Sequence, residues 1–268
     1  MAKTVLITGA SKGFGRVWAE AFLEKGYHVA ATARNVATLA DLKAKYGDRV
    51  LTLQLDVDRR QESMEVVQQV KQHFGSIDIL INNAGYALIG AVEETTEQEA
   101  RAQMETNFFG TLWLTQAVLP VMREQKSGHI IQVSSILGLA ALPSMGLYSA
   151  SKFAVEGFTE ALAAEVKDFG IRLTLVEPNG YASNIWHTGI ATAPDPVYDG
   201  LRKTLASHKT EFGQVEATAS ALLHLAETEN PPLRLFLGKV ALPFVKQTYA
   251  EKLELWEAWN ELSVAAHG

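Results

Sequence analysis

The sequence predicts an α/β fold in which helices cover both faces of a single parallel sheet. Seven short runs of apolar and β-branched residues alternate with segments of helical periodicity, the pattern of repeated βαβ units. Most runs are apolar almost throughout, as expected of strands covered on both faces. The predicted strands span residues 3–8, 28–33, 49–55, 77–82, 129–134, 171–177 and 233–238.

The segments between the strands carry apolar residues at helical spacing, for example Val17, Ala21 and Phe22 after the first strand. Crossovers between parallel strands are right-handed almost without exception, so these units predict a doubly wound, Rossmann-type sheet. No linker, repeat or low-complexity run divides the sequence, and residues 1–268 are expected to form one domain.

The composition is that of a soluble globular protein, with 47% hydrophobic and 20% charged residues. The net charge of −6 argues against nucleic acid or an anionic membrane as a partner. The sequence has no cysteine, which excludes disulfides and thiolate metal sites. The first residues lack the length of a secretory apolar segment, and no run reaches membrane-spanning length, so a cytoplasmic location is expected.

A glycine-rich stretch, TGASKGFG at residues 8–15, follows the first predicted strand and precedes a helical pattern. Gly9 suits a tight turn, and Gly13 and Gly15 allow the backbone and the helix to approach a pyrophosphate closely. The N-terminus of the following helix offers N–H groups and a positive dipole end to that phosphate. A plain βα turn is the alternative, but the strand–loop–helix context favours a dinucleotide site.

The end of the second strand indicates which dinucleotide binds. A carboxylate there would accept the ribose 2′-hydroxyl of NAD, but this sequence has Ala33 followed by Arg34. Lys12 lies in the glycine-rich stretch. Arginine can bind a phosphate with two hydrogen bonds, and lysine adds a point charge. The two cations therefore predict NADP(H), although either one alone could be a solvated surface charge.

The stretch YSASK, residues 148–152, carries a tyrosine and a lysine four residues apart. On a helix these side chains share one face. Tyrosine has a pKa of about 10, too high for easy proton exchange at neutral pH, and a neighbouring ammonium would lower it. The pair is therefore a candidate for general acid–base chemistry, with a solvent-exposed helix turn as the alternative.

Six short motifs, in this order and spacing, resemble the short-chain dehydrogenase/reductase family. They are TGASKGFG, LDV at 55–57, NNAG at 82–85, NFFG at 107–110, VSSILG at 133–138 and YSASK. The resemblance runs from about residue 3 to residue 240. It implies a seven-stranded sheet in the order 3-2-1-4-5-6-7 and an activity like that of the carbonyl reductases that prefer NADP(H).

The resemblance also implies a role for individual residues. Tyr148 would be the general acid/base, and Lys152 would hold the nicotinamide ribose and lower the tyrosine pKa. Ser135 would position the substrate oxygen, and Asn107 would support a water connected to the lysine. The residues expected to bind the cofactor are Gly9, Ser11, Lys12, Gly13, Phe14, Gly15, Arg34, Asp56, Val57, Asn83, Ala84, Gly85, Tyr148, Lys152, Pro178, Gly180 and Ser183.

Two departures from the family pattern stand in the C-terminal half. In PNGYAS, residues 178–183, Asn179 replaces a glycine and Ser183 replaces a threonine. Asparagine tolerates a positive φ and serine keeps the hydroxyl, so both roles should survive. The ending PPLRLFLGKVA differs from that of tetrameric members of the family. A homo-oligomer is expected, and its size, dimer or tetramer, stays open.

The expected substrate pocket is apolar or aromatic and contains no lysine or arginine, which suits an apolar ketone, aldehyde or secondary alcohol. Some of its leucines could instead belong to the core. The pocket candidates are Leu137, Leu142, Met145, Tyr181, Asn184, Ile185 and Trp186. Residues 181–213 form a long irregular connection expected to act as a substrate lid, with a surface insertion as the alternative.

The last stretch, about residues 243–265, carries Leu253, Trp256 and Trp259 at helical spacing and is expected to be a packing or subunit face.

Three functions fit these features. The first is an NADPH-dependent carbonyl reductase, reversible to alcohol oxidation. The second is an NAD-dependent secondary-alcohol dehydrogenase, which Arg34 and Lys12 disfavour. The third is a protein that senses NADP(H) without catalysis, since a fold does not fix a function. A sensing protein would be expected to lack the tyrosine or the lysine, so the filled catalytic positions favour an enzyme.

Overall fold

A seven-stranded parallel sheet runs through the computed structural model, which describes residues 2–182, 189–207 and 211–268. The sheet order is β3-β2-β1-β4-β6-β7-β9. Its strands are β1 (Thr4–Ile7), β2 (His28–Ala33), β3 (Val50–Gln54), β4 (Ile79–Asn82), β6 (Gly128–Val133), β7 (Ile171–Pro178) and β9 (Arg234–Leu237). Counted along the chain, these seven strands have the order 3-2-1-4-5-6-7, so the predicted topology is confirmed.

Each predicted apolar run forms a strand at or within a residue or two of the expected place. The central strands β1 and β4 are buried at every residue, because helices cover both of their faces. The strand pair β5 (Leu88–Ile89) and β8 (Ile190–Ala191) lies outside the main sheet and was not expected. Two residues give too short a pattern to stand out in a sequence.

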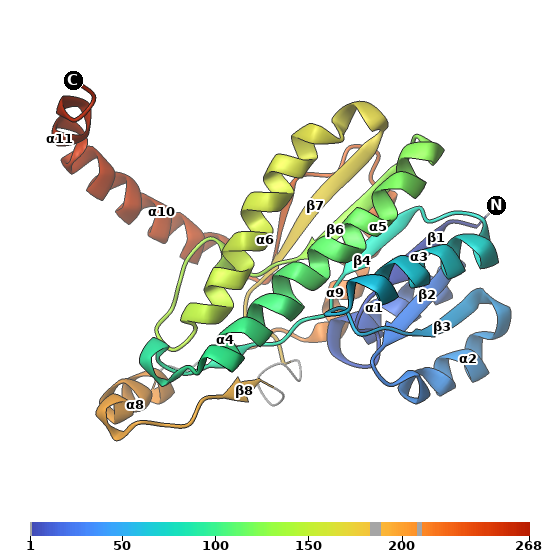
Figure 1. Cartoon of the computed structure of the whole chain (residues 1–268), viewed down its shortest axis with the longest axis horizontal. Helices are drawn as coiled ribbons and strands as arrows, with labels where there is room; N and C mark the ends of the chain where they lie inside the picture. The colour runs from blue at the N-terminus through green and yellow to red at the C-terminus, as the bar shows by residue number, and fades with distance from the viewer. Residues whose placement is uncertain (1, 183–188, 208–210) are drawn as a thin grey trace.

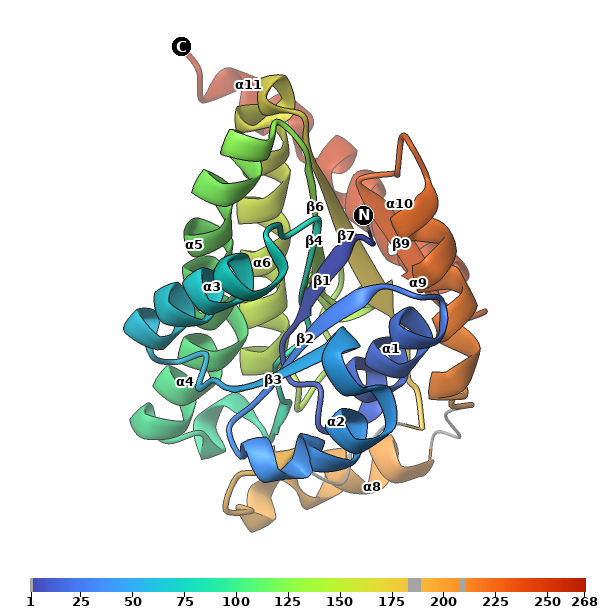
Figure 2. The ribbon, with the colours of Figure 1, turned by 90° about the vertical axis from the view of Figure 1, so that its right-hand side faces the viewer.

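Two helical layers enclose the sheet, one on each side (Figure 2). The first consists of α1 (Gly13–Glu24), α2 (Ala40–Tyr46) and α9 (Thr218–Glu227), and the second of α3 (Arg60–Phe74), α5 (Gly110–Gln125) and α6 (Gly146–Glu165). On the first side Trp18, Phe22 and Leu222 are fully buried against the sheet. On the other side Val67 and Leu114 are fully buried. Each face of the sheet thus has its own core.

The remaining elements are short or peripheral. The helices are α4 (Glu97–Met104), α8 (Asp199–Ser207), α10 (Ala241–Ala258) and α11 (Asn260–Ala265). The short turns are η1 (Val36–Leu39), η2 (Gly47–Arg49), η3 (Val92–Glu94), η4 (Glu105–Phe109), η5 (Ile136–Gly138), η6 (Lys167–Phe169), η7 (Pro196–Tyr198) and η8 (Val215–Ala217). Within the described part of the chain, no helix combines the length and apolar character needed to cross a bilayer.

The connection expected to be a lid contains β8, η7 and α8, and its described part is tied to the segment after β4. The backbone N–H of Asp195 donates to Glu94 Oε1 at 2.8 Å, and Arg202 pairs with the same carboxylate. The pairing of β8 with β5 continues this attachment. Ser183, Asn184, Ile185 and Trp186 lie outside the described residues.

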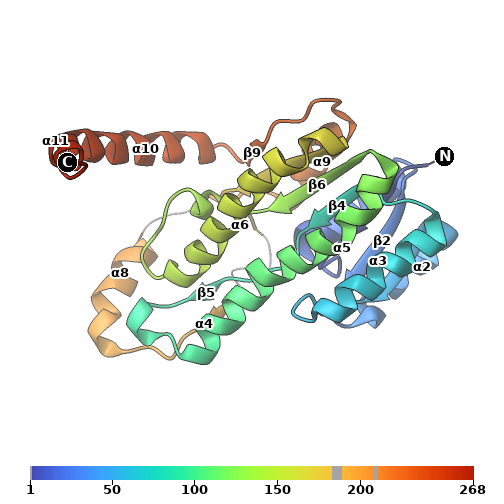
Figure 3. The same cartoon turned by 45° about the horizontal axis from the view of Figure 1, so that its top comes forward.

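The C-terminal helices α10 and α11 extend away from the body of the molecule (Figures 1 and 3). Ala241 and Val245 at the start of α10 are buried against the body. From Leu253 to the end of the chain every residue is exposed. We call α10 and α11 together the C-terminal arm.

Candidate active site

The glycine-rich loop lies between β1 and α1, where the chain turns sharply into the helix. Gly9 has a φ of +65° and Gly13 a φ of +56°, conformations that favour glycine. A Cβ at Gly15 would lie 2.5 Å from Asn83 Nδ2 and 2.5 Å from the carbonyl oxygen of Gly9. A Cβ at Gly13 would meet nothing within 4 Å. Gly15 therefore permits close packing inside the loop, while the space over Gly13 is open.

The N-terminus of α1 is suited to an anion. No side chain caps the helix, and no acidic residue stands in its first turn. Its N-cap residue, Lys12, is exposed, and its ammonium forms no ion pair with the residues that the structure describes. Uncapped N–H groups and the positive end of the dipole favour a phosphate at such a place.

Arg34 is exposed directly after β2, as the sequence predicts. Burial raises the pKa of Asp58, and the charge of Arg34 acts in the opposite direction, so the guanidinium stands near that acid. No salt bridge joins Arg34 to any residue within the described ranges. The side chain is therefore exposed and free of salt bridges within the described ranges, and its binding of a phosphate stays a prediction.

The stretch NNAG joins the end of β4 to the glycine-rich loop. Asn83 Nδ2 donates to the carbonyl oxygen of Thr8 at 2.8 Å, and the Asn83 and Ala84 N–H groups both donate to Thr8 Oγ1 at 2.9 Å. A Cβ at Gly85 would lie 3.0 Å from Asn107 Oδ1 and 3.8 Å from Lys152 Nζ. Because Gly85 has no side chain, the backbone after β4 can approach Asn107 and Lys152, two of the predicted catalytic residues.

Tyr148 and Ser135 come together above the carboxyl end of the sheet. Ser135 precedes η5, where its Oγ accepts the Leu137 N–H at 3.1 Å, and Tyr148 lies in the first turn of α6. Both side chains are buried. Burial raises the pKa of Tyr148 to about 12, and a hydrogen bond with the Ser135 side chain acts in the opposite direction. The phenol is therefore protonated at neutral pH.

Lys152 lies one helical turn after Tyr148, with its Nζ 5.8 Å from the centre of the tyrosine ring. Nζ donates to the carbonyl oxygen of Val133 at 2.7 Å. Burial lowers the pKa of Lys152 to about 8, and the negative charge of Glu156 opposes this shift. Burial is the main influence on the Tyr148 pKa in the free protein, and the expected lowering of that pKa by the Lys152 ammonium stays a prediction.

Asn107 is buried in η4, a π-helical turn between α4 and α5. Its Nδ2 donates to the Tyr86 carbonyl oxygen and to Ser151 Oγ, each at 3.0 Å, and its Oδ1 accepts the Tyr86 N–H at 3.1 Å. The extra residue of a π-turn re-aims side chains, and such turns are frequent at functional sites. The turn brings Asn107 toward the helix that carries Tyr148 and Lys152.

Apolar side chains cluster around Tyr148, but only some of the predicted pocket residues belong to this cluster. Leu137 and Met145 do, together with Ala87 and with Phe244 from α10, neither of which the sequence suggested. Two other predicted pocket residues lie outside this cluster, and their place in the pocket stays a prediction. Leu142 is 42% exposed. Tyr181 is buried against the Phe14 ring, 5.1 Å between centroids.

The other predicted cofactor residues lie along the same edge of the sheet. Asp56 and Val57 follow β3, Pro178 ends β7, Gly180 follows it and Ser11 is in the glycine-rich loop. Val57 is buried and packs closely against α5, where a Cβ at Gly110 would come within 2.8 Å of its side chain.

Asn179 does not need the positive φ suggested by the glycine it replaces, since Lys126 and Ser144 are the non-glycine residues with positive φ in the described ranges. Its Nδ2 donates to the Gly180 carbonyl oxygen at 3.0 Å.

A buried ionic cluster that the sequence did not reveal begins at Glu156, one helical turn after Lys152 on α6. Arg234 of β9 pairs with Glu156 of α6 and with Glu177 of β7, the latter at 2.9 Å, and also with the exposed Glu160 at 2.9 Å. Glu156 and Glu177 are buried, and burial together with the nearby Glu156 charge raises the pKa of Glu177 to about 8. The spacing of Lys152, Glu156 and Glu160 could have suggested part of this cluster, but Arg234 is far away in sequence.

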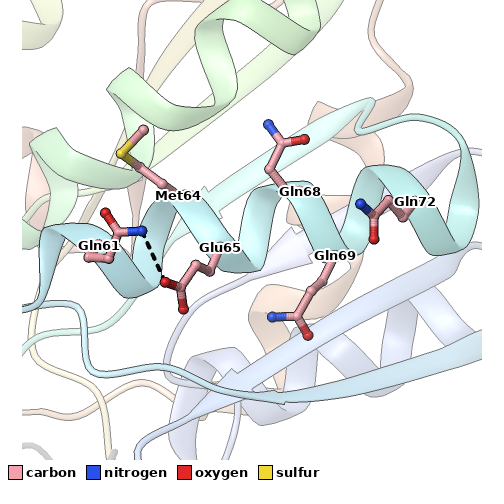
Figure 4. A pocket seen from close by; sticks show the side chains of 6 residues that line it. All are labelled: Gln61, Met64, Glu65, Gln68, Gln69 and Gln72. Atoms are coloured by element: carbon pink, nitrogen blue, oxygen red, sulfur yellow. Dashed lines mark hydrogen bonds between the residues drawn. The ribbon is translucent and has the colours of Figure 1, made fainter.

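Two surface hollows lie outside the group of predicted catalytic residues. One follows the exposed side of α3, where polar side chains stand along a single helix (Figure 4), and its lining residues are Gln61, Met64, Glu65, Gln68, Gln69 and Gln72. The other adjoins α10, and its lining residues are Leu139, Glu160, Arg234, Phe236, Val245 and Tyr249.

A family comparison agrees with this geometry. The model of the short chain dehydrogenase family matches residues 3–192, most of the chain and all four predicted catalytic positions. The chain is a short-chain dehydrogenase/reductase. It is therefore an oxidoreductase of a family that acts on CH–OH and C=O groups with nicotinamide cofactors.

Similar proteins extend over nearly the whole chain. Oxidoreductase BOA17 of Botryotinia fuckeliana is 38% identical, with 99% of this chain and 100% of that protein covered. The 3-ketodihydrosphingosine reductase of Bacteroides thetaiotaomicron is 36% identical, with 97% and 95% covered. Because so little of this chain is left uncovered, both similarities extend well beyond the part matched by the family model.

Solved structures show the same fold. A short-chain dehydrogenase from Streptomyces avermitilis superimposes with a TM-score of 0.90 at 38% identity, covering 99% of this chain and 98% of that one. ElxO with NADP bound gives a TM-score of 0.76 at 28% identity, covering 91% of this chain and all of the other.

Proposed function

We propose that this short-chain dehydrogenase/reductase is a cytoplasmic enzyme that uses NADPH to reduce an apolar ketone or aldehyde to an alcohol. The observation that carries the proposal is the meeting of Tyr148 and Ser135, two buried hydroxyls, with Lys152 one helical turn away. A carbonyl that receives hydride develops negative charge on its oxygen, and two hydroxyl donors aimed there would stabilise it.

The residues at the glycine-rich loop fit a dinucleotide. Gly9 and Gly15 keep the loop narrow, and the uncapped N-terminus of α1 favours a pyrophosphate. Lys12 and Arg34 would bind the 2′-phosphate of NADP(H), because both cations are exposed near this edge and neither has a salt bridge among the described residues. When bound, the cofactor would supply or accept the hydride.

The protonation states favour reduction. With a pKa raised to about 12, the Tyr148 phenol carries the proton that a forming alkoxide needs. Lys152, whose pKa is lowered to about 8, is still mainly an ammonium at neutral pH and can donate to a ribose hydroxyl. Asn107 would orient a water that returns a proton towards this lysine, since it is held at the π-turn by three hydrogen bonds.

The substrate class follows from the cluster around Tyr148. Leu137, Met145, Ala87 and Phe244 provide apolar surface and no charge. The name of the Bacteroides relative specifies a ketone as the group reduced, which supports the same direction for this chain. Ser183, Asn184, Ile185 and Trp186 would complete the carboxamide site and the pocket, and the rest of residues 181–213 would form the lid.

The test is the oxidation of NADPH, and separately of NADH, with ketones and aldehydes of increasing size. We expect turnover with NADPH on bulky apolar carbonyls. Tyr148→Phe should reduce kcat by about 10²–10⁴-fold, the usual contribution of a general acid, while the Kd for NADPH stays unchanged. Turnover retained in this variant would contradict the assignment of the acid.

The cofactor preference is tested by Arg34→Asp. We expect this change to weaken NADPH binding far more than NADH binding, because a carboxylate repels the 2′-phosphate and accepts a 2′-hydroxyl. Equal effects on both cofactors would contradict the proposed role of Arg34. Oxidation of secondary alcohols with NAD alone would identify the dehydrogenase alternative, and binding of NADPH without turnover on any substrate would identify a sensing protein.

A further inference from the structure

Lys152 is a buried cation without a salt bridge among the residues that the structure describes. It is 6% exposed, and its Nζ donates to the neutral carbonyl oxygen of Val133 at 2.7 Å. Burying an ammonium is costly unless an opposite charge lies nearby. The lysine therefore needs an anion close to it if it is to stay charged at neutral pH.

Glu156 is placed to supply that charge. It lies one helical turn after Lys152 on α6, so the two side chains share one side of the helix. Glu156 is 4% exposed, and its Oε2 pairs with Arg234 of β9. Its Oε1 has no hydrogen-bond partner within the described ranges. The carboxylate thus contacts one cation, lies one turn from another, and has one oxygen uncommitted.

Glu156 and Lys152 approach the same short turn after β6. Lys152 Nζ bonds to Val133, the last residue of that strand, and a Cβ at Gly138 in η5 would lie 3.1 Å from Glu156 Oε1. The same Cβ would lie 2.8 Å from Ser134 Oγ, a buried hydroxyl that also lacks a partner among the described residues. The uncommitted carboxylate oxygen therefore lies against the turn that also accepts the ammonium.

The neighbouring carboxyl groups are less suited to this task. Glu177 is protonated at neutral pH, because burial raises its pKa to about 8. The side chain of Glu160 is 64% exposed, so water screens its charge. The negative charge of Glu156, in contrast, opposes the lowering of the Lys152 pKa. The other titratable or charged groups packed around this cluster are Tyr148 of α6, Arg234 of β9 and, on the C-terminal arm, Tyr249 and Lys252.

We propose that Glu156 is a positioning residue whose carboxylate is the counter-ion of the Lys152 ammonium, and that Arg234 holds this carboxylate in place. The role rests on the proposed function, in which the charged lysine binds the nicotinamide ribose beside Tyr148. Glu156 would act only through Lys152.

The experiment is a carbon-13 NMR titration of the Lys152 side chain in the full-length protein without cofactor or substrate. The Lys152 signal is identified by its loss in Lys152→Met. We expect Glu156→Gln to lower the Lys152 pKa from about 8 by about one pH unit, because a neighbouring opposite charge is removed. Glu156→Met tests the same point with an apolar side chain of similar length, should glutamine disturb the fold.

A second variant removes a replacement charge. Loss of the Glu156 charge favours ionisation of Glu177, since that charge helps to raise the Glu177 pKa. The double variant Glu156→Gln with Glu177→Gln cannot ionise at either position, and its Lys152 pKa should fall at least as far. In the carbonyl-reduction assay the upper limb of kcat/KM against pH should move to lower pH by the same amount.

Two controls separate the charge of Glu156 from its shape. Glu156→Asp keeps the charge on a shorter side chain, so the Lys152 pKa should stay close to that of wild type although the thermal midpoint falls. Glu160→Gln removes the exposed carboxylate that pairs with the same Arg234 at 2.9 Å, and it should leave the Lys152 pKa unchanged.

Three results would overturn the inference. The first is a Lys152 pKa that is unchanged in both the single and the double glutamine variant. The second is a fall in Glu156→Asp as large as that in Glu156→Gln, which would assign the effect to shape. The third is a fall in Glu177→Gln alone, which would make Glu177 the counter-ion.

The NMR titration does not depend on turnover, so the counter-ion and the proposed function can fail separately. A lowered Lys152 pKa in Glu156→Gln, in a protein that reduces no carbonyl, would support the counter-ion and contradict the proposed function. Carbonyl reduction by wild type, with an unmoved Lys152 pKa and an unmoved limb in the variants, would support the proposed function and refute the counter-ion.

Discussion

Replacing Glu177 by glutamine should make the stability of the protein less dependent on pH. Glu177 is fully buried in β7, with Arg234 at 2.9 Å from its Oε1. Its Oε2 has no hydrogen-bond partner among the described residues. Burial and the adjacent Glu156 raise the pKa of Glu177 from 4.5 to about 8, so the folded protein keeps this carboxyl protonated at neutral pH.

The sign follows from the protons bound in each state. Between pH 4.5 and pH 8 the unfolded chain has lost the Glu177 proton and the folded chain retains it, so stability falls as pH rises through this interval. The pKa difference corresponds to a loss on the order of 4 kcal/mol across the interval. Glutamine has a similar shape and is always neutral, so Glu177→Gln should remove most of this loss.

The assay is the urea-unfolding free energy of both proteins at several pH values across that interval. The control is Glu160→Gln, which removes the exposed carboxylate at 2.9 Å from the same Arg234 and should keep the wild-type slope. If wild type and Glu177→Gln lose stability equally as pH rises, Glu177 is ionised in the folded protein, and the assigned protonation of the ionic cluster is wrong.

Three further predictions test other parts of the structure. Gly15→Ala should weaken NADPH binding or the stability of the fold by about 1–3 kcal/mol, because the added Cβ would lie 2.5 Å from Asn83 Nδ2. The control Gly157→Ala adds its Cβ to open space on α6 and should stabilise the fold by about 0.5–1 kcal/mol. Thermal unfolding measures the stability of both variants, and NADPH titration measures their cofactor binding. Burial lowers the pKa of His129 to about 3, so stability should fall as pH drops below the ordinary value of 6.5, and His129→Gln should flatten this acid limb of the unfolding curve. Lys152→Met should abolish the limb near pH 8 in the profile of kcat/KM against pH, which reports groups of the free enzyme, and should lower kcat at least about a hundredfold. A limb that persists would assign it to another group.

The parts of the site that are continuous in sequence could be predicted from it. The glycine-rich loop is determined locally, because positive φ values at Gly9 and Gly13 and close packing at Gly15 depend on residue type. Tyr148 and Lys152 needed only helical spacing. The pocket stays a prediction, because in sequence an apolar residue looks the same whether it lines a pocket or, like Tyr181, packs against a core side chain.

The sequence by itself determined the alternation of strands and helices, the glycine-rich turn and the helical spacing of Tyr148 and Lys152, because apolar periodicity and local turn chemistry specify them. The sheet order was predicted only through the resemblance to the family, and the roles of the loop and of the two side chains stay predictions. Only the tertiary structure revealed the contact of Phe244 with the cluster at Tyr148 and the cluster of Glu156, Glu177 and Arg234. Strand order and helix packing bring these distant residues together. Burial then decides the direction of each pKa shift, and how deeply a side chain is buried follows from the packing of the whole chain.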